Sequence, residues 1–66
     1  MKKMEMKKIC NPLGIIVGEK WLDSFLVKAS SEETLMKLEP FGFKVVGIDI
    51  GYDYNSELVT MYARPN

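Results

Sequence analysis

The sequence predicts one small α+β domain covering residues 1–66, with an antiparallel or mixed sheet of four to five strands and one short helix on one face. Three observations lead to this expectation. Several segments alternate apolar and polar residues with the period of a strand, a single segment carries helix start signals, and glycine- or proline-containing turns separate them. The expected order is β-β-β-α-β-β, and residues 1–3 and 65–66 are the ends where fraying is expected.

The N-terminal third predicts a meander. Residues 1–10 alternate imperfectly and are read either as a strand or as a flexible arm. Residues 11–14, Asn-Pro-Leu-Gly, carry the residues of a type I turn, so the chain is expected to reverse there. Residues 15–17 then form a short β-branched strand, and Gly18-Glu19-Lys20 is read as the hairpin loop that ends it.

Residues 21–29 form the best strand of this half, because large apolar side chains occur on both of its faces. Such a strand is expected in the interior of the sheet. Trp21 begins it, and for a tryptophan at the start of a strand in so small a domain we favour a role as a core anchor over an exposed contact.

The one predicted helix begins after Ser30. The Ser30 hydroxyl can accept from the Glu33 N–H while the Glu33 carboxylate reaches back, which is the pattern of a capping box. Leu35 and Leu38 share a face that is expected to pack on the sheet. Pro40 disfavours helical geometry in the residue before it, so the helix is expected to be only about eight to ten residues long.

The C-terminal third predicts two more strands. Residues 43–50 alternate as an interior strand, and the intervening helix would let it pair in parallel beside or near residues 21–29. Residues 51–56 form a polar loop, after which residues 57–64 alternate again. An antiparallel hairpin is therefore expected to close the fold.

Composition excludes several classes of function. The single cysteine, Cys10, cannot form an internal disulfide, and without histidine the common zinc sets cannot be assembled, so we predict no metal and no cofactor. The usual general base near neutral pH is also missing, which leads us to predict that the protein is not an enzyme. No apolar run approaches the roughly 18 residues of a membrane span, so we expect a soluble cytoplasmic protein with no membrane partner.

Residues 45–51, VVGIDIG, resemble the opening strand of the actin-like ATPases and of the RNase H-like nucleases. That resemblance would imply metal or phosphate binding by Asp49, but those folds need far more sheet than 66 residues supply. We therefore interpret Asp49 as a strand carboxylate that reaches solvent. Nearby, Asp53, Asn55 and Glu57 have the alternate spacing of calcium ligands but lack the glycine and the final glutamate of an EF-hand loop, so we interpret them as turn residues.

The preferred function is a non-enzymatic protein-interaction module, a small regulator or inhibitor that also self-associates as a homodimer. One helix cannot cover both faces of a sheet, so apolar surface should remain for a partner, formed by members of Leu22, Leu26, Leu58 and Tyr62 or by their counterparts on the opposite face. The expected contact is the loop containing Tyr52, Asp53, Tyr54 and Asn55, because exposed tyrosines supply large, rigid contact area.

The alternative is a nucleic-acid-binding protein that uses Lys2, Lys3, Lys7 and Lys8 as a phosphate-binding arm. Charge is unevenly distributed along the chain. Residues 1–30 hold six lysines and three acids, a net charge of +3, and residues 31–66 hold three basic and six acidic residues, a net charge of −3. Solvated surface is the simpler reading of such a lysine run, and no arginine or aromatic residue accompanies it.

Overall fold

A computed structural model describes residues 1–47 and 58–66 and confirms a small α+β domain. Four strands and two α-helices are present in the described part of the chain, with a short 3₁₀ turn after each helix, so the expectation of a single helix was wrong. The elements in chain order are α1 (Lys3–Cys10), η1 (Asn11–Leu13), β1 (Ile16–Trp21), β2 (Ser24–Ala29), α2 (Glu32–Met36), η2 (Glu39–Phe41), β3 (Phe43–Gly47) and β4 (Val59–Pro65).

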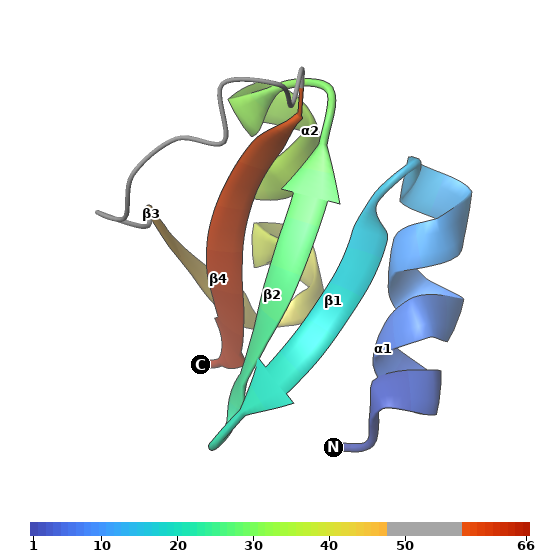
Figure 1. Cartoon of the computed structure of the whole chain (residues 1–66), viewed down its shortest axis with the longest axis vertical. Coiled ribbons are helices and arrows are strands. Elements are labelled where there is room, and N and C mark those ends of the chain that lie inside the picture. The colour runs from blue at the N-terminus through green and yellow to red at the C-terminus, as the bar shows by residue number, and fades with distance from the viewer. Residues whose placement is uncertain (48–57) are drawn as a thin grey trace.

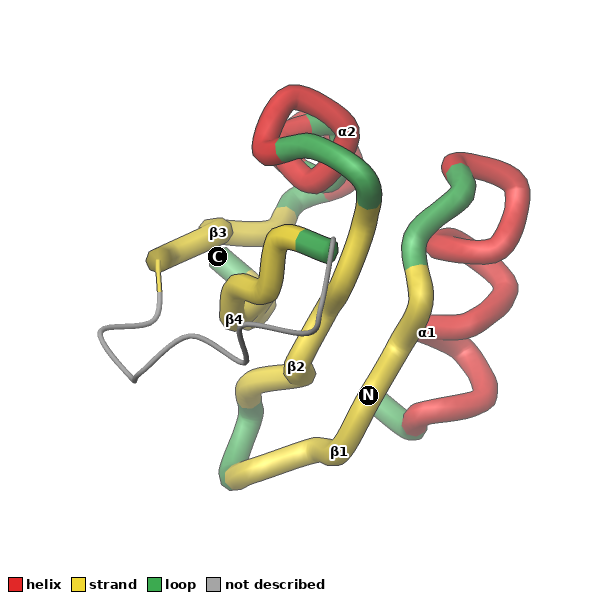
Figure 2. The backbone as a smooth tube through the Cα atoms, turned by 45° about the horizontal axis from the view of Figure 1, so that its top comes forward, coloured by secondary structure: helices red, strands yellow, loops and turns green. Residues whose placement is uncertain are grey.

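The four strands form one antiparallel sheet in the order β1-β2-β4-β3 (Figure 1). Both helices lie on the same side of this sheet: α1 runs along β1, and α2 packs behind the upper end of β2 (Figures 1 and 2). The opposite face of the sheet carries no helix from the described residues.

The first element is a helix, and not the strand or arm that the alternating residues suggested. Met6 and Cys10 are four residues apart, which places them on one side of a helix, and both are fully buried against the sheet. Met4, which shares the strand-like alternation, is exposed. A repeat of two in a short segment also satisfies the four-residue spacing, so the exposure of Met4 is what distinguishes the helix from a strand. Gly14, with φ of 77°, then ends η1 and directs the chain into β1.

The β1–β2 hairpin turns later than expected. Residues 18–20 continue β1 up to Trp21, with a register irregularity between Val17 and Lys20, and the two-residue turn is Leu22-Asp23. Trp21 is 68% exposed, so its assignment as a core anchor was wrong. The added residue of the bulge explains the change, because it lets Lys20 pair with Phe25 and turns Trp21 to the other face.

The second helix begins one residue later than predicted and ends before Pro40. Ser31, and not Ser30, is the N-cap: its Oγ accepts from the Thr34 N–H at 3.2 Å and contacts the Thr34 hydroxyl at 2.9 Å. The helix has five residues, so the expected length of eight to ten was wrong: helical bonding already stops at Lys37, ahead of Pro40, which is placed in η2. Leu35 and Leu38 are fully buried as predicted.

The sheet order corrects one strand assignment and confirms another. β2 lies inside the sheet, as expected, but β3 is an edge strand. β2 and β3 run in the same direction and are joined through α2, yet β4 lies between them, so they do not pair. The hairpin of β3 and β4 is antiparallel as predicted, and Ile48, Asp49 and Ile50 lie outside the described residues.

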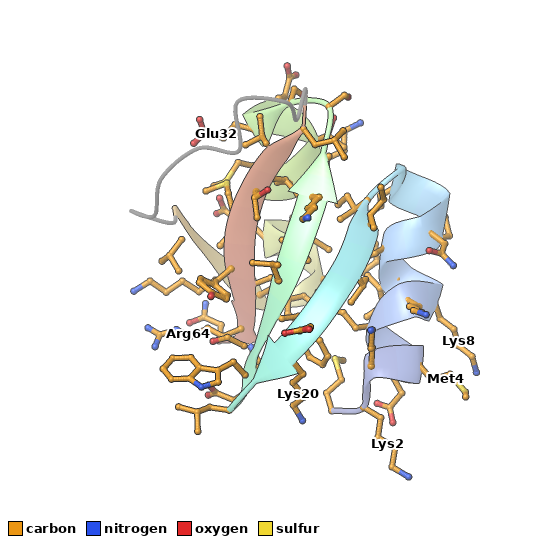
Figure 3. The ribbon with its side chains drawn as sticks, viewed as in Figure 1. Lys2, Met4, Lys8, Lys20, Glu32 and Arg64 are labelled. Carbon is orange, nitrogen blue, oxygen red and sulfur yellow. The ribbon has the colours of Figure 1, made fainter. Side chains whose placement is uncertain are left out.

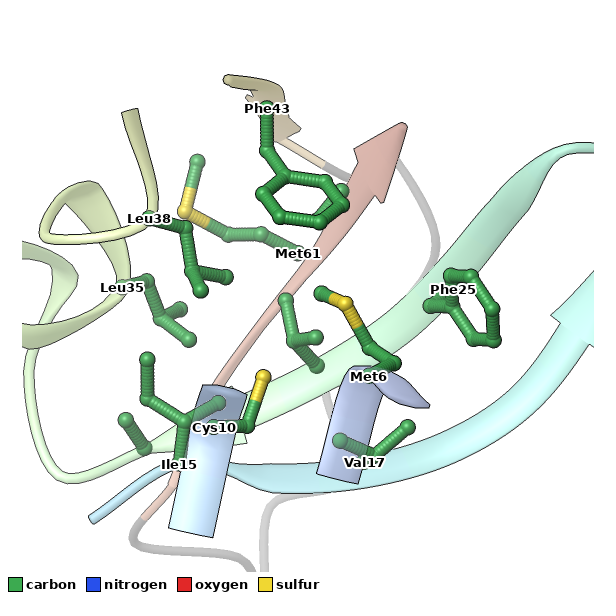
Figure 4. Close-up of a cluster of buried hydrophobic side chains, with 12 residues drawn as sticks. Met6, Cys10, Ile15, Val17, Phe25, Leu35, Leu38, Phe43 and Met61 are labelled. Atoms are coloured by element: carbon green, nitrogen blue, oxygen red, sulfur yellow. The ribbon is translucent and has the colours of Figure 1, made fainter. Parts of the chain in front are cut away.

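One hydrophobic cluster fills the space between the sheet and the two helices (Figure 4). It takes alternate residues from β2 and β4 and the inward residues of both helices. Its buried members are Met6, Cys10, Ile15, Val17, Phe25, Val27, Ala29, Leu35, Leu38, Phe43, Met61 and Ala63. Because successive residues of a strand point to opposite faces, the neighbours of these residues in each strand lie on the uncovered face.

Candidate functional site

The predicted partner-binding loop and Glu57, the last of the residues with calcium-ligand spacing, fall in the range 48–57. Tyr52, Asp53, Tyr54 and Asn55 lie outside the described residues, and so does Asp49. The predicted roles of these side chains in partner binding or as turn residues therefore stay predictions.

The four lysines of the predicted arm, Lys2, Lys3, Lys7 and Lys8, are exposed and belong to α1 or to its N-cap. Lys2 and Lys8 extend outward from the helix in Figure 3. Because α1 lies on the covered side of the sheet, these lysines form a surface separate from the uncovered face.

The uncovered face carries a continuous apolar row across three strands, which we call the central row. It consists of Leu26 on β2, Tyr62 on β4 and Val46 on β3. Tyr62 pairs in register with both of the others. Leu26 and Tyr62 are half-buried by their neighbours, whereas Val46 is 37% exposed. The central row therefore presents apolar side chains to solvent over most of the width of the sheet.

Two flanking rows border the central row. The row on one side consists of Trp21 on β1, Ser24 on β2, Arg64 on β4 and Lys44 on β3. Trp21 pairs with Ser24, and Arg64 pairs with Lys44. Arg64 lies beside Ser24, because the residues next to them, Ala63 and Phe25, are partners. On the other side, Lys28 lies between Ile16 and Thr60, and Ile16 is 55% exposed. The apolar centre thus has polar or basic groups along both sides, with a large exposed apolar residue at the β1 end of each row.

The charges of the flanking rows are of one sign. Lys28, Lys44 and Arg64 are the charged residues of these rows, and Lys44 stands directly opposite Arg64. Like charges at directly opposed positions of a sheet are destabilising, by roughly 0.2–1 kcal/mol. In residues 1–47 and 58–66, no carboxylate forms an ion pair with either side chain. An anionic group from outside would remove this repulsion.

A hollow of about 330 Å³ opens where β1 meets the central row, lined by Glu19, Lys20, Trp21, Leu26 and Tyr62. Gly18 lies close to the Leu26 side chain, as shown by the 3.2 Å that would separate a Cβ at position 18 from Leu26 Cβ. Glu19 contributes the carboxylate of the hollow.

Two observations on the described part of the chain concern metal binding and the reactivity of its one cysteine. No group of three histidine, cysteine, aspartate or glutamate side chains there could hold a metal ion. Cys10 is buried in the core, and the resulting desolvation raises the pKa of its thiol to about 11. A thiol that is protonated at neutral pH is a poor nucleophile. No helix among the described residues is long and apolar enough to cross a bilayer.

The uncovered face was only partly visible in the sequence. Of the residues expected to form residual apolar surface, Leu26 and Tyr62 are neighbours in the central row, Leu22 is at the exposed β1–β2 turn, and Leu58 precedes β4. Trp21 and the paired cations Lys44 and Arg64 were missed. Strand alternation alone places Arg64 on the face of Tyr62 and Lys44 on the face of Val46, but only the strand order brings the two cations together. Comparisons of the chain with models of protein families, with curated proteins and with solved structures found no match.

Proposed function

We propose that this protein is a non-enzymatic interaction module, a regulator or inhibitor, whose uncovered sheet face binds a partner protein. The observation that carries the proposal is the central row, a partly exposed apolar strip flanked by cations on both sides. Protein interfaces combine an apolar centre with a polar rim and are enriched in tryptophan, tyrosine and arginine. Trp21, Tyr62 and Arg64 supply these three residue types on one face.

The charge of the rim specifies the chemistry of the partner. Lys28 lies on one side of the central row, and Lys44 and Arg64 lie on the other, against the single carboxylate of Glu19 at the hollow. Complementary potentials favour association and like charges suppress it. The partner surface is therefore apolar at its centre and carries carboxylates on both sides.

A second copy of the chain fits this face less well than a different protein. If two uncovered faces met around a two-fold axis with their central rows in contact, both flanking rows would bring cations against cations, because each flank is basic. The homodimer remains a prediction that light scattering during size exclusion tests directly. A dimer that is dispersed by Tyr62→Lys would show that copies pair through this face and would contradict our assignment of a foreign partner.

Site-specific photo-crosslinking in cells of the source organism tests the proposal. A benzoylphenylalanine in place of Tyr62 lies in the central row, and the same residue in place of Lys37, an exposed position at the end of α2, is the matched control on the covered side. We expect one protein adduct from the Tyr62 position that is absent from the Lys37 position. The same adduct protein, once purified, must bind the unlabelled chain. Equal labelling from both positions, or no adduct, would contradict the proposal.

Nucleic-acid binding is the second candidate, and the structure supplies a new reason to test it. Cations and two aromatic residues, Trp21 and Tyr62, occur on the same sheet face, and single strands bind to proteins by stacking on aromatic rings beside basic groups. Titration with a fluorescent 20-nucleotide oligo(dT) and with a duplex of equal length, at low and at moderate salt, separates this candidate from the first. No binding at low salt would end it, whether through the sheet face or through the lysines of α1.

A further inference from the structure

The turn between β1 and β2 has an unfavourable residue at its first position. Trp21 pairs with Ser24 across a two-residue loop, and Leu22 has a φ of 56°. Among the described residues, Leu22 is the one non-glycine residue with a positive φ. A two-residue hairpin loop with positive φ at its first position alone is of type II′, which prefers glycine there. A leucine at this position strains the backbone.

The strain is not offset by packing within the described part of the chain. Leu22 is 76% exposed and Trp21 is 68% exposed, and neither belongs to the hydrophobic cluster. A glycine at position 22 would suit the turn better, and a polar residue would suit its solvation better. Backbone strain of this kind is found where the surrounding structure maintains it for a function. Leucine is thus unfavourable for the backbone conformation of the turn, but it supplies a large apolar side chain for contact with a partner.

The surroundings of this pair are those of the uncovered face. Trp21 begins the flanking row that contains Arg64 and Lys44, and it lines the hollow beside the central row. Lys20 also lines this hollow, but its Nζ is engaged elsewhere: it donates to the Met1 carbonyl at 2.8 Å and lies 5.6 Å from the centre of the Phe25 ring. The turn also contributes Asp23, a single carboxylate.

We propose that Trp21 and Leu22 form the anchor of the interface, inserting into an apolar pocket of the partner protein whose neighbouring carboxylates meet Lys44 and Arg64. This inference rests on the proposed function and assigns the residues that carry its affinity. Hot spots are enriched in tryptophan and occur where side chains become fully desolvated. The hairpin fixes the backbone of both residues before binding, so less conformational entropy is lost on association than in a flexible segment.

A lipid surface is the other apolar environment that could receive Trp21 and Leu22. The charged side chains around these two residues favour a protein pocket over a lipid surface. A protein surface that binds an anionic bilayer carries several cationic side chains around the side chains that insert into the lipid. At this turn, Lys20 is engaged with Met1, and Asp23 lies beside Leu22. The free cations Lys44 and Arg64 instead border the central row. A protein pocket with its carboxylates on one side matches this asymmetry.

Calorimetric titration of the purified adduct protein with variants of this chain tests the anchor. Leu22→Gly removes the side chain and relieves the turn, so we expect at least tenfold weaker binding together with a melting temperature that is higher by several degrees. Trp21→Ala should weaken binding by at least thirtyfold. Phe41→Ala is the matched control, because Phe41 is 55% exposed on η2, outside the strands that form the uncovered face, and its loss should leave the affinity unchanged.

The outcomes separate the anchor from the proposed function. If Leu22→Gly and Trp21→Ala bind like the unchanged chain, the anchor is wrong while the interaction module stands. If Phe41→Ala weakens binding as strongly as they do, the anchor is also wrong. Sedimentation with vesicles of phosphatidylcholine and phosphatidylglycerol that requires Leu22 would replace the protein pocket with a lipid surface. If no adduct forms from the Tyr62 position, the proposed function itself is contradicted.

Discussion

Replacing Gly42 by alanine should destabilise the protein through the backbone alone. Gly42 follows η2 with φ of 93°, its N–H donates to the Glu39 carbonyl, and its own carbonyl accepts from the Asn66 N–H at 2.8 Å. A Cβ at this position would have no atom within 4 Å, so steric overlap with neighbours plays no part. The change therefore isolates the cost of a positive φ for an L-residue.

The expected magnitude follows from two opposing effects. A left-handed conformation costs a non-glycine residue about 1–2 kcal/mol. Alanine also lowers the entropy of the unfolded chain, which stabilises the folded state by about 0.4–1 kcal/mol. The net loss is about 1 kcal/mol, which in a domain of this size lowers the melting temperature by about 4–8 °C.

Gly47→Ala is the control, and thermal melting followed by circular dichroism is the assay. Gly47 ends β3 without a positive φ in the left-handed range, and a Cβ there would also meet nothing within 4 Å. Only the entropic effect applies, so its melting temperature should stay constant or rise slightly. Equal shifts in the two variants would refute the reasoning, because the backbone conformation at Gly42 would then have no measurable cost.

Three further outcomes are expected. Ser31→Ala should lose about 1 kcal/mol of stability in urea unfolding, since it removes the cap of α2, whereas Ser30→Ala should change it by less than about 0.5 kcal/mol, and the reverse order would restore the predicted cap. Burial raises the pKa of the Cys10 thiol to about 11, above its ordinary 9.0, so this group favours the folded state below pH 9 and ceases to do so as pH rises to 11. Urea midpoints that fall over this range in the unchanged chain but not in Cys10→Ala would show it, and equal declines would contradict it. Met6→Ala should cost about 2–5 kcal/mol and lower the helical signal in circular dichroism, and an unchanged signal would mean that α1 does not depend on this contact.

Local sequence signals predicted the parts of the fold in which burial follows a single repeat. β2 and β4 alternate cleanly, with Phe25 and Val27 buried on one and Met61 and Ala63 buried on the other, and both were expected as strands. Leu35 was also expected to be buried. In each of these segments the apolar residues fit only one of the two periods, that of a strand or that of a helix, so the sequence alone predicts the secondary structure.

The errors occur where two local readings were equally good. The four-residue spacing of Met6 and Cys10 places them on one face of either a strand or a helix. The sequence does not show that this segment packs beside β1, where it forms a helix. Ser30 and Ser31 are both acceptable caps, and Thr34 decides for Ser31 through two contacts. The candidate site was harder to predict still, because the uncovered face joins residues from strands that are distant in sequence.

The placement of β4 has a consequence for the synthesis of the protein. β4 is an interior strand that pairs with both β2 and β3, although it follows them in the chain. A ribosome therefore releases β1, β2 and β3 before the strand that joins them exists, and β3 has no neighbour until then. Contacts between segments so distant in sequence form slowly. The β1–β2 hairpin can form earlier, but the four-stranded sheet can assemble only once β4 has left the exit tunnel.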